Sequence, residues 1–402
     1  MSLTKVTYSM ISGTYVNALD YGAVGDGVND DTGAIQDAID AAVAANGIVY
    51  IPAGNYKTTA PINIYGECSV YGAGIGKTVI KPTTAVAEAV QIGNVVSQAN
   101  AHTGVIRDFT VDRVTYDGTS SNGGFVFYWS FQSSLYDLES REYKYNFWFK
   151  PQEGQAVAYM SLYNMVGVGG YYNVFWDPDT GGSPAGYANE ITFYGGRMFT
   201  RAVTQTNVYW DGGSNNRFIN MSCEGEGNHA FYIGGAGNFI LQPRTEGTWV
   251  VANIAVSPTA LRTLIIDHSF YTVVSDGGEG TTYITHNSGN KFSTTLNDVV
   301  TSTFFHESGT DGSNVEFINN RFSNTDYAWK ALETATSSNP GWLSTQGEMY
   351  ASRRFKSGQS GWNFYPLILG TYYFWVDGSG RLRIKNGVPT SDTDGTVVGT
   401  QT

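Results

Sequence analysis

The fold is decided by a segment that ends at Tyr56 and begins Val16-Asn-Ala-Leu-Asp-Tyr-Gly-Ala-Val-Gly-Asp-Gly27. Its closely spaced glycines predict a tight loop, because glycine adopts the left-handed backbone angles that such turns require. The chain continues with Asn29-Asp-Asp-Thr32, in which Asp30 or Asp31 is suited to cap the start of a helix. We therefore expect a compact loop that leads directly into a helix.

The predicted helix covers about residues 30–46 and has one apolar face. Its apolar residues recur at the spacing of helical turns: Ala34, Ile35, Ala38, Ile39, Ala42 and Val43. Asn46-Gly47 provides a C-terminal stop. A short apolar strand follows over residues 48–51, and Pro52 ends it.

These residues resemble the opening of a known family. The run Tyr21-Gly-Ala-Val-Gly-Asp-Gly27, followed by residues 29–32 and by Val49-Tyr-Ile-Pro-Ala-Gly-Asn-Tyr56, is similar to the start of pectate-lyase-3-like right-handed parallel β-helices. Within that group it looks most like bacteriophage tailspikes and capsule depolymerases, and both ends of the chain also look phage-like. The resemblance implies an all-β fold: a right-handed parallel β-helix with an N-terminal capping helix and a small C-terminal antiparallel β domain. The family contains lyases, hydrolases, deacetylating enzymes and non-catalytic binders, so the motif fixes no chemistry.

The composition agrees with an all-β chain. The 402 residues include 49 glycines, 14% aromatic residues and only 14% charged residues, with a formal net charge of −12. Turn-rich β proteins have this balance. The negative charge argues against nucleic-acid binding, which needs a basic surface. An acidic polysaccharide would need a local cluster of arginine or lysine to bind.

Several features of the sequence indicate where the protein is located. Cys68 and Cys223 are expected to be buried free thiols rather than a disulfide. No apolar run reaches the roughly 18 residues of a membrane span, so we expect no membrane partner. The N-terminus lacks the pattern of a secretory signal. A virion protein, assembled in the host cytoplasm and released by lysis, needs no such signal, and we expect this protein on the phage tail.

Residues 16–325 are predicted to form the coils of the β-helix. Asn216 and Asn238 lie 22 residues apart, as do Glu224 and Glu246, and this interval fits one coil. Further coils are expected where similar apolar alternation begins, at Leu135, Leu162, Ile191 and Phe218. Residues 1–15 are interpreted as a leader that docks onto another tail protein. Residues 326–402 are interpreted as a C-terminal β region, and the resemblance implies that this region joins three chains in a homotrimer.

The candidate catalytic residues are Glu224, Glu246 and Glu226. Glycoside hydrolysis uses two carboxyl groups, one as the acid and one as the nucleophile or base. The 22-residue interval would stack Glu224 and Glu246 on neighbouring coils, whose backbones lie about 4.8 Å apart. Such closeness should raise the pKa of one carboxyl, as a general acid requires. The alternative interpretation is a solvated outer face of the solenoid.

Substrate-binding residues are predicted around these glutamates. Aromatic faces stack on sugars and cations bind acidic sugars, which suggests Trp249, Trp210, Arg244 and Arg197. Asp267 and His268 follow one coil later and could join the site. No cluster of acidic residues suitable for a metal is evident, so neither a metal nor another cofactor is expected.

The sequence therefore predicts a phage tailspike that binds and depolymerises a bacterial surface polysaccharide, either capsule or O-antigen. Hydrolysis by the glutamates is the first mechanism. The first alternative is a lyase that acts by β-elimination on a uronic-acid polymer, with arginines, His268 or tyrosines as its groups. The second is a non-catalytic receptor-binding or structural tail protein, and a cellular pectin-type enzyme is a further rival.

Overall fold

The computed structural model describes residues 15–94, 101–113, 121–152, 154–177, 186–267, 272–278, 281–285, 291–294, 301–308, 314–321, 367–369, 371–387, 390–391 and 393–399. The chain divides into a unit of residues 1–344 and a unit of residues 345–402. The predicted leader, apart from Tyr15, and all of residues 322–366 lie outside the described residues.

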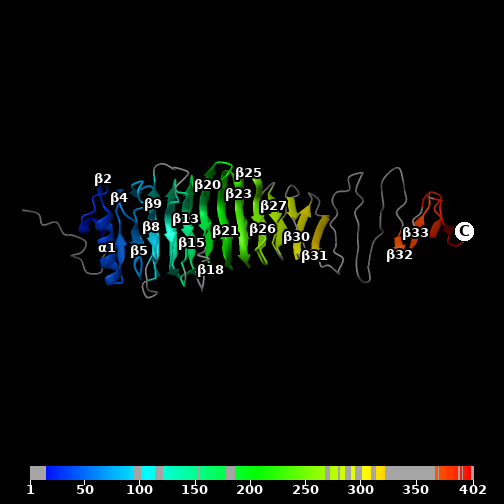
Figure 1. Ribbon diagram of the computed structural model, residues 1–402, viewed down its shortest axis with the longest axis horizontal. Coiled ribbons are helices and arrows are strands. Elements are labelled where there is room, and N and C mark those ends of the chain that lie inside the picture. Colours follow the sequence, from blue (N-terminus) through cyan, green and yellow to red (C-terminus); the bar gives the residue numbers. More distant parts are fainter. Residues whose placement is uncertain are drawn as a thin grey trace, which may run out of the picture. The chain divides into compact units, whose positions relative to one another are not determined.

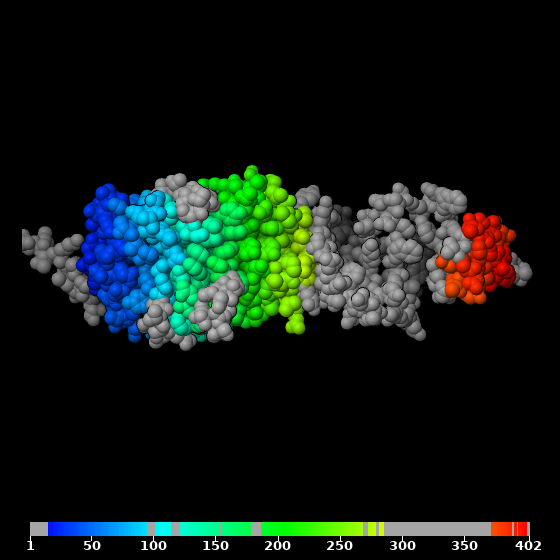
Figure 2. All heavy atoms as spheres, in the orientation of Figure 1, coloured from blue at the N-terminus to red at the C-terminus, as the bar shows by residue number. Residues whose placement is uncertain are grey.

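The first unit is a right-handed parallel β-helix with three stacks of strands, which confirms the predicted fold (Figure 1). Its coils follow one another in sequence order, so their colours form consecutive bands (Figure 2). We call the stacks A, B and C, in the order in which one coil passes through them.

Stack A contains these strands: β1 (Val16–Asn17), β3 (Ile48–Tyr50), β6 (Ser69–Tyr71), the first parts of β9 (Val105–Asp112) and β12 (Ser134–Arg141), β15 (Ser161–Tyr163), β19 (Thr192–Tyr194), β22 (Arg217–Ile219), β24 (Phe239–Leu241), β26 (Leu264–Asp267), β28 (Thr282–Thr285) and β30 (Thr301–Ser308). Stack B contains β2 (Asp26–Asp30), β4 (Gly54–Thr58), β7 (Thr78–Pro82), the second parts of β9 and β12, β16 (Val166–Val168), β20 (Arg197–Arg201), and the first parts of β23 (Ser222–Ala236) and β25 (Arg244–Val256).

Stack C contains β5 (Ile62–Ile64), β8 (Glu88–Ile92), β10 (Gly123–Phe127), β13 (Tyr145–Phe149), β17 (Tyr172–Trp176), β21 (Thr206–Ser214), the second parts of β23 and β25, β27 (Val273–Asp276) and β29 (Lys291–Thr294). Outside the stacks, β11 (Ser130–Phe131), β14 (Ala156–Ala158) and β18 (Tyr187–Asn189) form a small parallel sheet. An antiparallel strand, β31 (Asn314–Arg321), follows β30.

The N-terminal end of the core is covered as predicted. A 3-10 helix, η2 (Ala18–Tyr21), precedes α1 (Thr32–Ala44), and α1 buries Ile35, Ala38, Ile39 and Ala42 against the first coil. Asp31 is the N-cap residue, yet its carboxylate accepts hydrogen bonds from the backbone N–H groups of Val24 and Gly25 rather than from the helix. This aspartate therefore ties the glycine loop to the helix.

The core is a set of inward-facing columns between the stacks. In stack A, Leu135 pairs with Leu162, Leu162 with Phe193, and Phe193 with Phe218. The predicted alignment of Ile191 with Leu162 and Phe218 is therefore wrong by two residues, because Ile191 and Phe193 are both apolar and both fully buried. Cys68 and Cys223 are buried free thiols, as expected, and burial raises the pKa of the Cys68 thiol to about 12.

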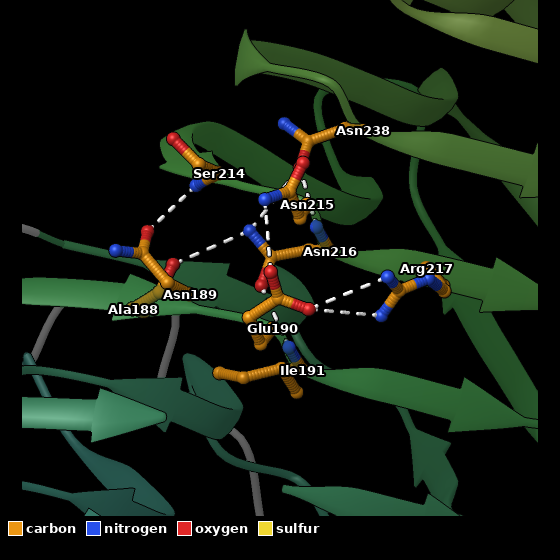
Figure 3. Close-up of polar contacts among 9 residues, drawn as sticks. All are labelled: Ala188, Asn189, Glu190, Ile191, Ser214, Asn215, Asn216, Arg217 and Asn238. Atoms are coloured by element: carbon orange, nitrogen blue, oxygen red, sulfur yellow. Dashed lines mark hydrogen bonds and ion pairs between the residues drawn. The ribbon is translucent and has the colours of Figure 1, made fainter. Parts of the chain in front are cut away.

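Asparagine side chains stabilise the corner that leads into stack A (Figure 3). The Oδ1 atom of Asn216 accepts a hydrogen bond from the Ile191 N–H, and the Oδ1 atom of Asn238 accepts one from the Asn216 N–H at 2.8 Å. Both side chains are fully buried. They satisfy backbone groups that the turn would otherwise leave unpaired, which explains their 22-residue spacing.

The second unit contains a small antiparallel sheet, as the sequence predicts. It consists of β32 (Leu367–Leu369), β33 (Tyr372–Val376), β34 (Leu382–Asn386) and β35 (Thr396–Val397). Asp377, in the turn after β33, accepts hydrogen bonds from the side chains of Arg381 and Arg383. Among the residues that the structure describes, no helix is long and apolar enough to span a membrane.

Candidate active site

The predicted carboxylates lie on the outer face of stack B, on β23 and β25. The strand register places Glu224 directly beside Glu246, which confirms the pairing that the 22-residue interval predicts. Glu226 lies two residues further along β23, opposite Arg201 of β20 and Thr248 of β25. Parallel strands lie about 4.8 Å apart, so this small area of the stack carries three carboxylates.

Glu224 is held by fixed hydrogen bonds. Its Oε2 atom accepts from Nε of Arg197 at 2.9 Å and from Nη2 at 2.8 Å, and its Oε1 atom accepts from the Ser222 hydroxyl at 2.8 Å. The side chain is 18% exposed. The Arg197 guanidinium therefore holds the pKa of Glu224 below its ordinary value, despite the opposing effect of burial.

This result corrects one expectation. Stacking beside Glu246 was predicted to raise the pKa of one carboxyl, but the pKa of Glu224 is lowered, chiefly by the hydrogen bonds from Arg197. Glu224 is ionised at neutral pH, which suits a nucleophile or a base and does not suit a general acid.

Glu246 and Glu226 are more open to solvent. Glu246 forms an ion pair with Arg244, and these side chains are 61% and 66% exposed. Within the described residues, no strand pairs with the far edge of residues 244–249, so Glu246 lies on the last described coil of stack B. Glu226 is exposed on the preceding coil.

Each of these strands has a glycine directly after a glutamate: Gly225 follows Glu224, and Gly247 follows Glu246. Gly225 has a φ of +103° and Gly247 a φ of +140°. A Cβ atom on Gly247 would lie 1.8 Å from the carbonyl oxygen of Gly225, and one on Gly225 would lie 2.0 Å from that of Thr200. The coils therefore approach each other here more closely than any side chain permits, and this kinked backbone carries Glu224 and Glu226.

The other predicted site residues separate into two groups. Arg197 and Arg244 lie on the same outer face as the glutamates, and Trp249 is half-buried at the corner between stacks B and C, packed against the main core. Trp210 does not fit the predicted role, because it is fully buried among Phe149, Phe193 and Phe218.

Asp267 does not fit the predicted role either. It is fully buried, and its carboxylate accepts a hydrogen bond from the Tyr283 hydroxyl at 3.2 Å. It therefore stabilises the interior rather than facing a substrate. His268 lies outside the described residues.

The outer face of stack C carries an aromatic surface that the sequence analysis missed. Its rings come from four successive coils: Tyr145, Trp148, Tyr172, Phe175, Tyr209 and Tyr232. His229 lies beside Tyr232, with ring centroids 5.6 Å apart, and burial lowers the pKa of His229. These rings recur at irregular intervals, since the corners between strands vary in length, so no fixed period marks them in the sequence.

A second polar group lies at the corner before stack A (Figure 3). The Glu190 carboxylate accepts from both terminal nitrogens of Arg217 at 3.3 Å and from Nδ2 of Asn215 at 2.8 Å. These residues stack on the asparagine corner described above. The arrangement is that of a structural ion pair, and it provides a comparison for the Arg197–Glu224 pair.

Comparison with known proteins points to polysaccharide-modifying relatives. The family described as "Rhamnogalacturonase A/epimerase, pectate lyase-like" matches residues 15–131. A stretch of 73 residues is 51% identical to Mannuronan C5-epimerase AlgE2 of Azotobacter vinelandii and covers 16% of this chain and 7% of that protein. A stretch of 114 residues is 37% identical to Alginate lyase 7 of the same organism and covers 26% of this chain and 13% of that protein. The chain thus spans a small part of these curated relatives.

One solved structure, Geobacillus virus E2 ORF18, is 16% identical in sequence to this chain. The match covers 92% of this chain and 86% of the viral chain, with a TM-score of 0.49.

Proposed function

We propose that this chain is a tailspike-type depolymerase that hydrolyses a glycosidic bond of a bacterial surface polysaccharide, either capsule or O-antigen. The observation that carries the proposal is the set of Glu224, Glu246 and Glu226 on one outer face, with Glu224 beside Glu246 on the adjacent strand. The polysaccharide-modifying relatives support the substrate class. The phage-like opening motif supports the tailspike role.

In the proposed reaction Glu224 is the ionised carboxylate, because Arg197 and Ser222 stabilise its charge. A second glutamate donates a proton to the glycosidic oxygen as the bond to the anomeric carbon breaks. Glu224 either bonds to that carbon, in which case water later cleaves the glycosyl ester, or it takes a proton from the water that attacks that carbon. Glu246, on the neighbouring strand with a backbone-to-backbone spacing of about 4.8 Å, fits the roughly 5–5.5 Å separation of retaining enzymes. Glu226, roughly 6.6 Å along the strand, fits the separation of inverting enzymes. The stereochemistry of the product distinguishes these two assignments.

The neighbouring residues take supporting roles. Arg197 is a positioning residue, because its guanidinium forms an ion pair with Glu224 and so orients that carboxylate. Arg244, largely exposed beside Glu246, is assigned to substrate binding, as is Trp249 at the corner of the stack. We further propose a homotrimer on the phage tail, attached to another tail protein through the N-terminus.

A second candidate activity is β-elimination on a uronic-acid polymer. It is favoured by the relative named an alginate lyase and by His229, whose lowered pKa keeps the imidazole neutral and able to accept a proton. The arginines of stack B would then offset the carboxylate charge of the sugar.

The experiment digests purified capsule, O-antigen and alginate and follows reducing ends together with ultraviolet absorbance of unsaturated uronate. New reducing ends without absorbance support hydrolysis. A rise in absorbance supports elimination and overturns the glutamate mechanism. Binding of a polysaccharide without either signal overturns the enzyme proposal in favour of a receptor-binding spike.

A further inference from the structure

The outer face of stack C carries a continuous aromatic strip, which we define as Tyr145, Trp148, Tyr172, Phe175, Tyr209 and Tyr232. Neighbouring rings contact one another along the solenoid. The centroid of Phe175 lies 4.5 Å from that of Tyr145 and 5.4 Å from that of Tyr209, and Tyr209 lies 4.8 Å from Tyr232. Tyr145 and Trp148 belong to a small cluster separate from the main core, and Tyr172 and Phe175 pack against that cluster.

The edges of this strip are polar. Tyr209 and Tyr232 stack with an interplanar angle of 3°, which turns their faces toward each other and leaves their edges available. Burial raises the pKa values of Tyr172 and Tyr209, so these phenols remain protonated hydrogen-bond donors.

Two ammonium groups lie at the N-terminal end of the strip. Nζ of Lys144 lies 5.2 Å from the centroid of Tyr145, and Nζ of Lys150 lies 4.3 Å from that of Trp148. Lys150 also contacts Glu88 at 3.1 Å. Glu88 offsets the charge of Lys150, so Lys144 supplies most of the positive charge at this end of the strip, on a chain whose net charge is −12.

We propose that the aromatic strip is a second polysaccharide-binding surface, separate from the stack B glutamates, which holds a uronic-acid polymer along the solenoid. The sugar hydroxyls would bind the phenols, and sugar carboxylates would bind Lys144 and Lys150. A second copy of this chain is the rival occupant, and the oligomeric state of the tyrosine variant described below distinguishes the two. This inference rests on the proposed function only for the class of ligand, a polysaccharide.

The test measures retardation of the full chain in gels that contain alginate, polygalacturonate or neutral dextran. The wild type should be retarded by at least one polyuronate and not by dextran. The double variant Tyr209→Phe, Tyr232→Phe keeps both rings and removes two hydroxyls, so its apparent Kd should rise about tenfold. Lys144→Gln should weaken binding and reduce its dependence on salt.

The matched control is Tyr163→Phe, Tyr194→Phe, which removes two hydroxyls from rings stacked 4.7 Å apart on the outer face of stack A. Its binding should equal that of the wild type. Absence of retardation by both polyuronates, equal retardation by dextran, or equal effects of the two tyrosine pairs would each overturn the proposal. A change in oligomeric state of the Tyr209→Phe, Tyr232→Phe variant would also overturn it and identify the strip as a subunit interface.

Failure of this proposal differs from failure of the proposed function. Glu224→Gln should abolish cleavage without changing retardation, whereas the Tyr209→Phe, Tyr232→Phe variant should still cleave a short oligosaccharide. If the wild type binds polyuronate and cleaves nothing, the binding role of the aromatic strip is supported and the proposed catalytic activity is refuted.

Discussion

Gly247→Ala should destabilise the coil that carries the glutamates far more than an ordinary glycine substitution. Gly247 has a φ of +140°, and a Cβ atom there would lie 1.8 Å from the Gly225 carbonyl oxygen. The backbone strain costs about 1–2 kcal/mol, and relieving the clash requires the strands to separate, at about 1–3 kcal/mol. We expect a total loss of about 2–5 kcal/mol in the free energy of unfolding.

The matched control is Gly195→Ala, because Gly195 has a φ of +66° and nothing lies within 4 Å of its Cβ position. Its substitution should cost only the backbone strain, about 1 kcal/mol. Since the entropy of unfolding grows with chain length, a chain of 402 residues shifts its Tm by about 1.2 °C per kcal/mol, and thermal unfolding should separate Gly247→Ala from the control by about 1–5 °C. Equal Tm values for the two variants would refute the claim that close approach of the coils requires glycine here.

Three further predictions follow from individual contacts. In a double-mutant cycle of Arg197→Ala and Glu224→Gln, the coupling in the free energy of unfolding should be about 0.5–1 kcal/mol at pH 7, because the arginine is exposed and screened. The folded-state pKa of Glu224 is lowered, so this coupling is fully present above the ordinary value of 4.5 and is lost as the pH falls through the folded value; a coupling that grows toward pH 3 would contradict this. Asn216→Ala should cost about 2–4 kcal/mol, since it leaves buried backbone groups without a partner, and urea unfolding that matches the wild type would count against the asparagine corner. Trp210→Ala should cost about 3–5 kcal/mol through an empty core volume, while polysaccharide retention per folded molecule should remain that of the wild type; a selective loss of binding would restore its predicted substrate role.

The sequence predicts the β-helix well because its local signals agree with one another. The glycine loop, the apolar helix face and the strand after Asn46-Gly47 each specify their element without help from distant residues. The stacking of Glu224 and Glu246 was predictable because no insertion interrupts the coil between residues 216 and 247, and the buried Asn216 and Asn238 mark its corner.

The remaining errors have identifiable physical causes. Ile191 was misaligned because both Ile191 and Phe193 are apolar, so the sequence does not show which of them pairs with Leu162; in the structure it is Phe193. The pKa of Glu224 depends on Arg197, 27 residues away, which only the coil register brings into contact. Trp210 was assigned to substrate binding, but side chains alternate between the two faces of a strand, and the sequence alone did not show which face Trp210 is on. In β21, Val208 and Trp210 face the core.

The most direct test of the central claim compares Glu224→Gln with Glu190→Gln. Both glutamates bind an arginine of the neighbouring coil, but only Glu224 lies beside the second carboxylate. With a bacterial polysaccharide that the wild type cleaves, Glu224→Gln should release no new reducing ends, whereas Glu190→Gln should release them at the wild-type rate. Full activity of a folded Glu224→Gln variant would contradict the assignment of catalysis to stack B.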